Sequence, residues 1–188
     1  MPHFFTLQSK EVIDIVQKQG IYYPDFDKSL YLNNIPELRD LYDRVLSSFN
    51  YHNHTNLNGL IFSFLWQDDI DQICDFYDIE DFQEKILLAR DALLSLWRFF
   101  VEHDYKIISV NADPNLAPIF IDLNDFQFLM PPLYIIPPYT ENSVYRLLRN
   151  IDHAAFETSE YPSGLIQAHL PYIKKDDVTG IYDIFPIE

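Results

Sequence analysis

The chain has 188 residues, of which 48% are hydrophobic and 16% aromatic, and it carries a formal net charge of −16. This composition excludes a disordered chain, and the length predicts a single domain that covers residues 1–188. The negative charge repels phosphate backbones and anionic membranes, so it argues against direct nucleic-acid binding. It is explained by solubility alone or by attraction to a basic partner.

The N-terminal third of the sequence predicts alternating strands and helices. A short strand over Phe4–Leu7 is followed by Ser9, a residue that favours the N-cap of a helix. The helix is expected over Lys10–Gln19 and ends at Gly20, which can adopt the left-handed conformation common at a helix C-terminus.

A second helix is predicted over Pro36–Phe49, because proline suits its first turn and apolar residues recur at the three-to-four spacing of a core-facing stripe. A polar loop over residues 51–56 and a strand over Leu60–Trp66 follow. The longest helix is expected over Glu80–His103.

The C-terminal half predicts more strands. The β-branched runs Lys106–Val110 and Pro118–Asp122 are typical of a hairpin or of neighbouring strands. A helix over Glu141–Ile151, irregular chain and a final strand over Ile181–Phe185 complete the order. This mixture without regular alternation predicts an α+β fold, with a small, mostly antiparallel sheet packed against several helices.

Two Pro-Pro pairs interrupt the apolar segment between Asn124 and Tyr139. Asn124 or Asp125 can cap a single helical turn, which Pro131-Pro132 must end because proline lacks the N–H donor. Leu133–Ile136 then runs extended. We expect a buried, rigid crossover here, with a peptide-binding groove as the alternative.

Eight carboxylates and no lysine or arginine lie between Gln67 and Glu84. They are Asp68, Asp69, Asp71, Asp75, Asp78, Glu80, Asp81 and Glu84. Adjacent like charges repel, so the run predicts a solvated surface, a docking site for a basic partner or a cation site. It lacks the glycine and glutamate spacing of an EF-hand loop. The expected partner contacts are Asp68, Asp69, Asp71, Asp75 and Asp78.

Other polar residues suggest weaker sites. His52 and His54 could bind a metal if a third ligand converged on them, but nothing in the sequence fixes such a ligand, and the pair is better explained by a flexible polar loop. Arg146 and Arg149 share one helix face and could bind an anion or pair with carboxylates. Only four glycines are present, and no phosphate-binding loop, dinucleotide fingerprint or nucleophile elbow occurs. The sequence therefore predicts no catalytic residue and no cofactor.

The location predicted from the sequence is cytoplasmic. No apolar run approaches the ~20 residues that span a bilayer, and the N-terminus lacks the features of a signal peptide. The single cysteine, Cys74, cannot form an internal disulfide, which is typical of a reducing compartment.

The segment Phe5–Ser9, together with Glu11-Val12, Gly20 and Tyr22–Asp25, resembles the N-terminus of an uncharacterised bacterial family. That family opens with a T-(I/L)-Q strand, a helix and a glycine stop. Leu123–Phe126 resembles a later family segment where a strand ends and a short helix begins. The Trp-His pair that usually follows there is replaced by Phe128, Leu129 and Met130. The resemblance implies a fold and no activity.

A second resemblance is to ADP-ribosyltransferase-like domains, which open with a strand bearing histidine or arginine and a helix that ends in glycine. His3 and Gly20 occupy the matching places. This resemblance implies an NAD site formed by His3, Tyr22, Tyr23 and Glu157, with Glu160 as another candidate glutamate.

The leading hypothesis is an acidic, non-enzymatic interaction protein of a bacterium or its phage. It would bind and block a basic macromolecular surface, as small inhibitor or immunity proteins do. The alternatives are an NAD-consuming transferase and a homo-oligomer with a self-complementary aromatic surface.

Overall fold

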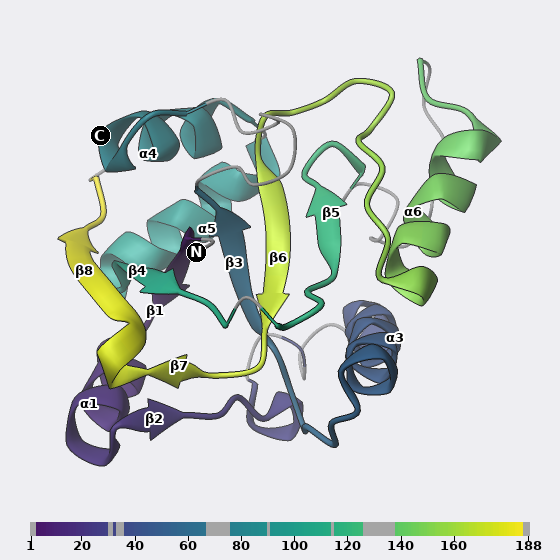
Figure 1. Ribbon diagram of the computed structural model, residues 1–188. Helices are drawn as coiled ribbons and strands as arrows, with labels where there is room; N and C mark the ends of the chain where they lie inside the picture. Colours follow the sequence, from purple (N-terminus) through teal and green to yellow (C-terminus); the bar gives the residue numbers. More distant parts are fainter. Residues whose placement is uncertain are drawn as a thin grey trace.

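A six-stranded antiparallel sheet organises the protein (Figure 1). The computed structural model describes residues 3–29, 32, 36–66, 76–89, 91–113, 115–125 and 138–185. In spatial order the strands are β5 (Phe120–Asp122), β6 (Ile166–Leu170), β3 (Ile61–Leu65), β1 (His3–Gln8), β4 (Lys106–Asn111) and β8 (Val178–Asp183). A second, two-stranded sheet pairs β2 (Ile21–Tyr22) with β7 (Ile173–Lys174).

Five α-helices lie in the described part of the chain. They are α1 (Lys10–Gln19), α3 (Pro36–Asn53), α4 (Ile79–Ala89), α5 (Asp91–Glu102) and α6 (Glu141–His153). The protein is thus an α+β domain, as the sequence predicts. No helix among the described residues combines the length and apolar character needed to cross a bilayer.

The boundaries of α1 follow from its two end residues. The Ser9 hydroxyl accepts a hydrogen bond from the Val12 backbone N–H at 3.4 Å, which satisfies a donor that has no partner within the helix. Gly20 has φ 83° and its N–H bonds the Val16 carbonyl, so the helix ends in the left-handed turn that glycine adopts without strain. Both sequence predictions for this helix are confirmed.

Both faces of the sheet are covered, and successive side chains of β1 show how. Phe4 packs with Ile13 and Val16 of α1, whereas Phe5 packs with Phe82 of α4 and Trp97 of α5. Neighbouring residues of a strand point to opposite faces, so β1 joins two separate core clusters.

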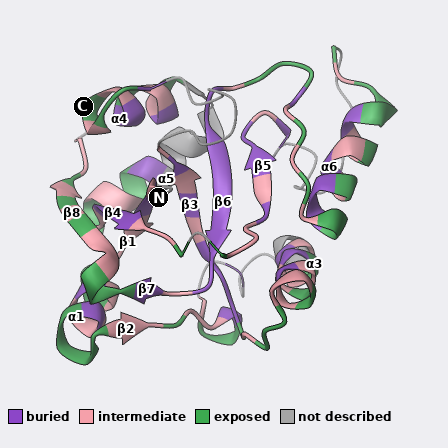
Figure 2. Ribbon diagram, in the orientation of Figure 1, coloured by how far each residue is buried: buried purple, intermediate pink, exposed green. Residues whose placement is uncertain are grey.

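A third cluster lies beside the β5 edge, where α3 and α6 pack (Figures 1 and 2). Its buried members are Phe26, Leu32, Tyr42, Val45, Phe49, Leu60, Ile119, Ile121, Leu147 and Ile151. Together the three clusters bring every described α-helix against the sheet or against another helix.

Two predictions are wrong, one about the pairing of strands and one about the length of a helix. Lys106–Val110 and Pro118–Asp122 do become strands, but β6, β3 and β1 lie between β4 and β5, so the two form no hairpin. The single helix Glu80–His103 is instead two helices, α4 and α5. A continuous helix of that length would extend for about 36 Å. Dividing it lets Phe82 and Trp97 enter the same core cluster.

Two further boundaries differ from the prediction. The helix that starts at Pro36 continues through His52 and Asn53, which the sequence assigned to a loop. The chain over Ile166–Leu170 was expected to be irregular, yet it is β6, whose five residues are all buried. The proposed crossover over residues 126–137 lies outside the described residues.

Candidate functional site

The described part of the acidic run belongs to α4 and the turn before it. Asp78 Oδ1 accepts hydrogen bonds from the backbone N–H groups of Glu80 and Asp81, at 3.0 and 2.9 Å. Asp78 therefore begins the helix, and its negative charge is favourable beside the helix N-terminus. The other predicted contacts, Asp68, Asp69, Asp71 and Asp75, lie outside the described residues.

The side of α4 that faces solvent carries large apolar groups beside its carboxylates. Tyr77 is 89% exposed and Leu88 is 85% exposed, while Glu80 and Glu84 are exposed between them. The spacing of four residues places Glu80, Glu84 and Leu88 along one stripe of α4, and Tyr77 lies in the turn before the helix. We call Tyr77, Glu80, Glu84 and Leu88 the α4 outer face. Figure 2 shows exposed surface on this helix.

The acidic run in the sequence indicates the charges of this surface but not its exposed tyrosine and leucine. The available signal was the helical spacing itself. Phe82 and Ile86 fall on the buried side of α4, so Leu88 and Glu84 must fall elsewhere. The solvent side of α4 therefore combines apolar and acidic side chains.

Arginines elsewhere on the surface are held by carboxylates. Arg39 pairs with Asp27 and Asp43, both at 2.8 Å. Arg149 pairs with Glu157, so the interpretation of Arg149 as a partner for an acidic side chain agrees with the structure. Within these ion pairs the arginine charge is cancelled by a carboxylate. The net negative charge of the protein therefore comes from other carboxylates.

A more buried ionic cluster joins the end of β5 to α6. Arg146 Nη2 lies 3.2 Å from Asp125 Oδ1, and Arg146 Nη1 lies 3.6 Å from Glu160. Asp125 has no exposed surface, and its pKa is raised because burial penalises the charged carboxylate. Hydrogen bonding from Ser159 and the charge of Arg146 oppose that rise. We call Asp125, Arg146 and Glu160 the ionic cluster; it ties the loop after α6 to the sheet.

The end of α3 separates His52 from His54. His52 lies in α3 with Nε2 2.9 Å from the Asp152 carbonyl, and His54 follows the helix at φ 53°. Among the residues that the structure describes, no group of three His, Cys, Asp or Glu side chains is placed to hold a metal ion.

The residues of the alternative NAD site lie in different parts of the fold. His3 contacts Trp66 on the face covered by α4 and α5, with ring centroids 5.7 Å apart. Tyr22 packs against the cluster on the opposite face, and Tyr23 contacts Tyr172. Glu157 lies in the loop after α6 and pairs with Arg149. The structure therefore does not bring these four side chains together.

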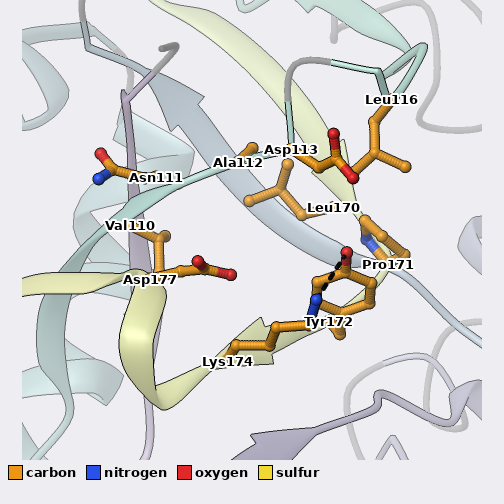
Figure 3. A pocket seen from close by; sticks show the side chains of 10 residues that line it. All are labelled: Val110, Asn111, Ala112, Asp113, Leu116, Leu170, Pro171, Tyr172, Lys174 and Asp177. Carbon is orange, nitrogen blue, oxygen red and sulfur yellow. Dashed lines mark hydrogen bonds between the residues drawn. The ribbon is translucent and has the colours of Figure 1, made fainter.

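The pocket in Figure 3 lies where β4 ends beside the connection between β6 and β7. Its volume is about 10 Å³, which accommodates about one water molecule. Lys174 Nζ lies across the Tyr172 ring and 3.5 Å from its hydroxyl, as the dashed line in Figure 3 shows. A pocket of this size cannot enclose a nucleotide or another organic ligand.

His169 is a buried histidine on β6, the strand next to the edge strand β5. Its Nδ1 lies 2.9 Å from the Ile119 carbonyl, so Nδ1 must carry the proton and donate it. Its Nε2 is buried without a hydrogen-bond partner among the described residues. Burial lowers the pKa of His169 to about 4, because the charged imidazolium would lose its hydration.

Because of His169, the protein is expected to become less stable in mild acid. The unfolded chain takes up a proton near the ordinary pKa of 6.5, whereas folded His169 stays neutral down to about pH 4. The unfolded state thus binds more protons within this window, so the free energy of unfolding falls as the pH falls, by up to about 3 kcal/mol.

Urea denaturation at several pH values between 7 and 4 would measure this effect. The variant His169→Gln keeps a neutral donor and should show a smaller decline than the wild-type protein over the same range. Parallel declines in the two proteins would contradict the assignment of the effect to His169.

Comparison of the chain with protein-family models, with curated proteins and with solved structures finds no match. The resemblances of Phe5–Ser9 and Leu123–Phe126 to the uncharacterised bacterial family therefore stay predictions, as does the likeness to ADP-ribosyltransferase-like domains.

Proposed function

We propose that the protein is a non-enzymatic, acidic interaction protein, in the manner of a small inhibitor or immunity protein, that uses the α4 outer face to bind a basic surface of a partner. The observation that carries this proposal is the exposure of Tyr77 and Leu88 on either side of Glu80 and Glu84. Tyrosine is among the residue types that supply most of the binding energy at protein interfaces, and charges around such residues guide the encounter.

The charge of the whole molecule supports the same partner class. A net charge of −16 creates a negative potential that accelerates association with basic proteins and opposes association with nucleic acids. The reducing compartment favoured by the single Cys74 supports a cytoplasmic location for this interaction. The residues of the alternative NAD site, which are His3, Tyr22, Tyr23 and Glu157, lie in different parts of the fold. We therefore do not propose an NAD-consuming activity as a second function.

The test combines identification of the partner with two charge-reversal variants. The wild-type protein is immobilised, and basic proteins retained from a bacterial lysate are identified by mass spectrometry and purified. The variant Glu80→Lys/Glu84→Lys is expected to bind the purified partner at least about tenfold more weakly, because two attractive contacts become repulsive. Tyr77→Ala should weaken binding by about 5- to 30-fold, as for an interface hot spot.

The matched control is Glu102→Lys/Glu141→Lys, which changes the net charge by the same amount at two exposed positions of α5 and α6. This control should retain most of the affinity. Association by the wild-type protein should also slow as salt rises from 50 to 500 mM, since exposed charges are screened. An equal loss in the control, or binding unaffected by salt, would contradict the proposal.

A further inference from the structure

A groove with a volume of about 400 Å³ lies between α1 and the edge strand β8. Ile13 and Val16 of α1 form one wall, and Ile108 of β4 forms the floor. Val178 and Ile181 of β8 form the other wall. Ile181 is 45% exposed, so apolar surface of β8 is open to solvent here.

The strand beside this groove has one side available for pairing. Within the described part of the chain, β8 pairs with β4 and with no other strand. The opposite side of an edge strand presents backbone N–H and C=O groups that another extended chain can bind. β8 has six residues, of which Gly180–Asp183 pair with β4 in one unbroken register before a β-bulge. This regular part offers a length of about 13 Å for such pairing.

The charge of the groove is opposite to that of the molecule. Among the described residues that line it, none is acidic, while Lys18 and Lys175 are both basic and exposed. Lys175 Nζ lies 3.4 Å from the Gln17 carbonyl, so this lysine sits beside the end of α1. Lys18 contacts Asp14 at 3.5 Å but remains 76% exposed at its side chain. The end of the groove next to Val178 is therefore suited to a carboxylate.

We propose that this groove binds an extended, acidic segment of a partner protein, which adds to the sheet as a strand beside β8. Alternate apolar side chains of the segment enter the groove toward Ile13 and Ile108. A carboxylate of the segment lies near Lys18 and Lys175. This surface is separate from the α4 outer face, because α1 and α4 cover opposite faces of the sheet.

Other occupants fit the observations less well. A fatty acid has an apolar chain and a carboxylate, but it cannot use the backbone donors and acceptors along β8. A second copy of this chain could pair through β8, but it would bring together two molecules that each carry a net charge of −16. A peptide strand uses the groove, the strand edge and the lysines at once.

The probe is a phage-displayed library of random peptides of about twelve residues, long enough to cover β8. We expect selected peptides to alternate apolar and polar residues and to contain aspartate or glutamate. The best peptide is synthesised with a fluorescent label, and its binding is measured by fluorescence anisotropy. The variant Lys18→Glu/Lys175→Glu should bind at least about tenfold more weakly, because two attractions become repulsions.

Two further changes separate strand addition from simple charge attraction. Ile181→Thr, which keeps a β-branched residue, should weaken binding by about fivefold through the loss of apolar contact. Methylation of alternate peptide nitrogens should weaken it by at least about tenfold, since the methylated nitrogens cannot donate to the edge of β8. Arg98→Glu, at an exposed position of α5, is the control and should leave binding unchanged.

Four results would overturn the proposal. The first is a selection that enriches no peptide. The second is binding that stays unchanged when the two lysines are replaced or when the peptide is methylated. Displacement of the peptide by dodecanoate at concentrations below its micelle range would favour a lipid occupant. Dimerisation of the free protein that Ile181→Thr abolishes, measured by sedimentation velocity, would favour a second copy. The α4 outer-face variants should bind the peptide normally. A failure of the groove proposal, which does not depend on the proposed function, can therefore be distinguished from a failure of the proposed function.

Discussion

Replacing Phe5 by alanine is expected to lower the free energy of unfolding by about 3–5 kcal/mol. Phe5 has no exposed surface, and its ring lies 4.6 Å from Trp66 and 4.9 Å from Phe82, measured between ring centroids. Trp66 directly follows β3 and Phe82 lies in α4, so one side chain joins the sheet to a helix that covers it. An alanine would lose the buried apolar surface and leave a cavity that rigid neighbours cannot fill.

Urea denaturation followed by circular dichroism would measure this change at pH 7. The matched control is Phe99→Ala, because Phe99 is the same residue type but is 43% exposed. Its replacement should cost about 1 kcal/mol or less, since a surface side chain leaves no closed cavity. Similar losses in the two variants would show that Phe5 does not hold the sheet and the α4–α5 layer together.

Replacing Arg146 by methionine is expected to lower the free energy of unfolding by about 3–5 kcal/mol, because it leaves the buried Asp125 carboxylate without its cation. Arg146 is only 12% exposed at its side chain, and Asp125 is 1% exposed. Methionine has a similar length and no charge, so the packing changes less than the electrostatics. The loss should therefore come from the ionic cluster rather than from a cavity.

The pH dependence of this loss gives a second measurement. A carboxyl whose pKa is raised in the folded state binds protons more tightly there than in the unfolded chain. Its contribution therefore opposes folding above the folded pKa and disappears as the pH falls below the unfolded value. Without Arg146 the pKa of Asp125 should rise further. The difference in the free energy of unfolding between Arg146→Met and the wild-type protein should therefore shrink in acid. Both proteins contain His169, so its contribution cancels in this difference.

The double variant Asp125→Asn/Arg146→Met is the control for the isolated charge. It removes both charges, so it should be more stable at pH 7 than Arg146→Met alone. A double variant that is equally unstable would assign the loss to packing of the Arg146 side chain instead of to the uncompensated Asp125 carboxylate.

Local features of the chain were predictable because their causes lie within a few residues. Ser9 and Gly20 determine where α1 begins and ends, and both act on backbone groups one turn away. The helix predicted over Glu141–Ile151 is also confirmed as α6, which extends two residues further, to His153. The strand β6 was missed because Gln167 and His169 are polar yet buried, which a pattern of hydrophobic residues does not reveal.

The candidate sites were harder to predict, because they depend on which surfaces remain uncovered. The spacing of α4 distinguishes Phe82 from Glu84, but only the packed sheet shows that Leu88 stays outside. The groove beside β8 requires that β4 pair with β8 rather than with β5, and no local signal in Lys106–Val110 indicates this partner. The placement of His3 and Tyr22 on opposite faces likewise depends on how β1 and β2 pack.

The sequence by itself determined the α+β class, the strong negative charge and the ends of helices such as α1, because composition and short-range hydrogen bonding set these properties. Only the tertiary structure decided the order of the strands, the division of the helix Glu80–His103 and the burial of Asp125 and His169. The physical reason is that strand pairing and desolvation depend on contacts between residues far apart in the chain. The energy of such contacts exceeds the local preferences that a sequence displays.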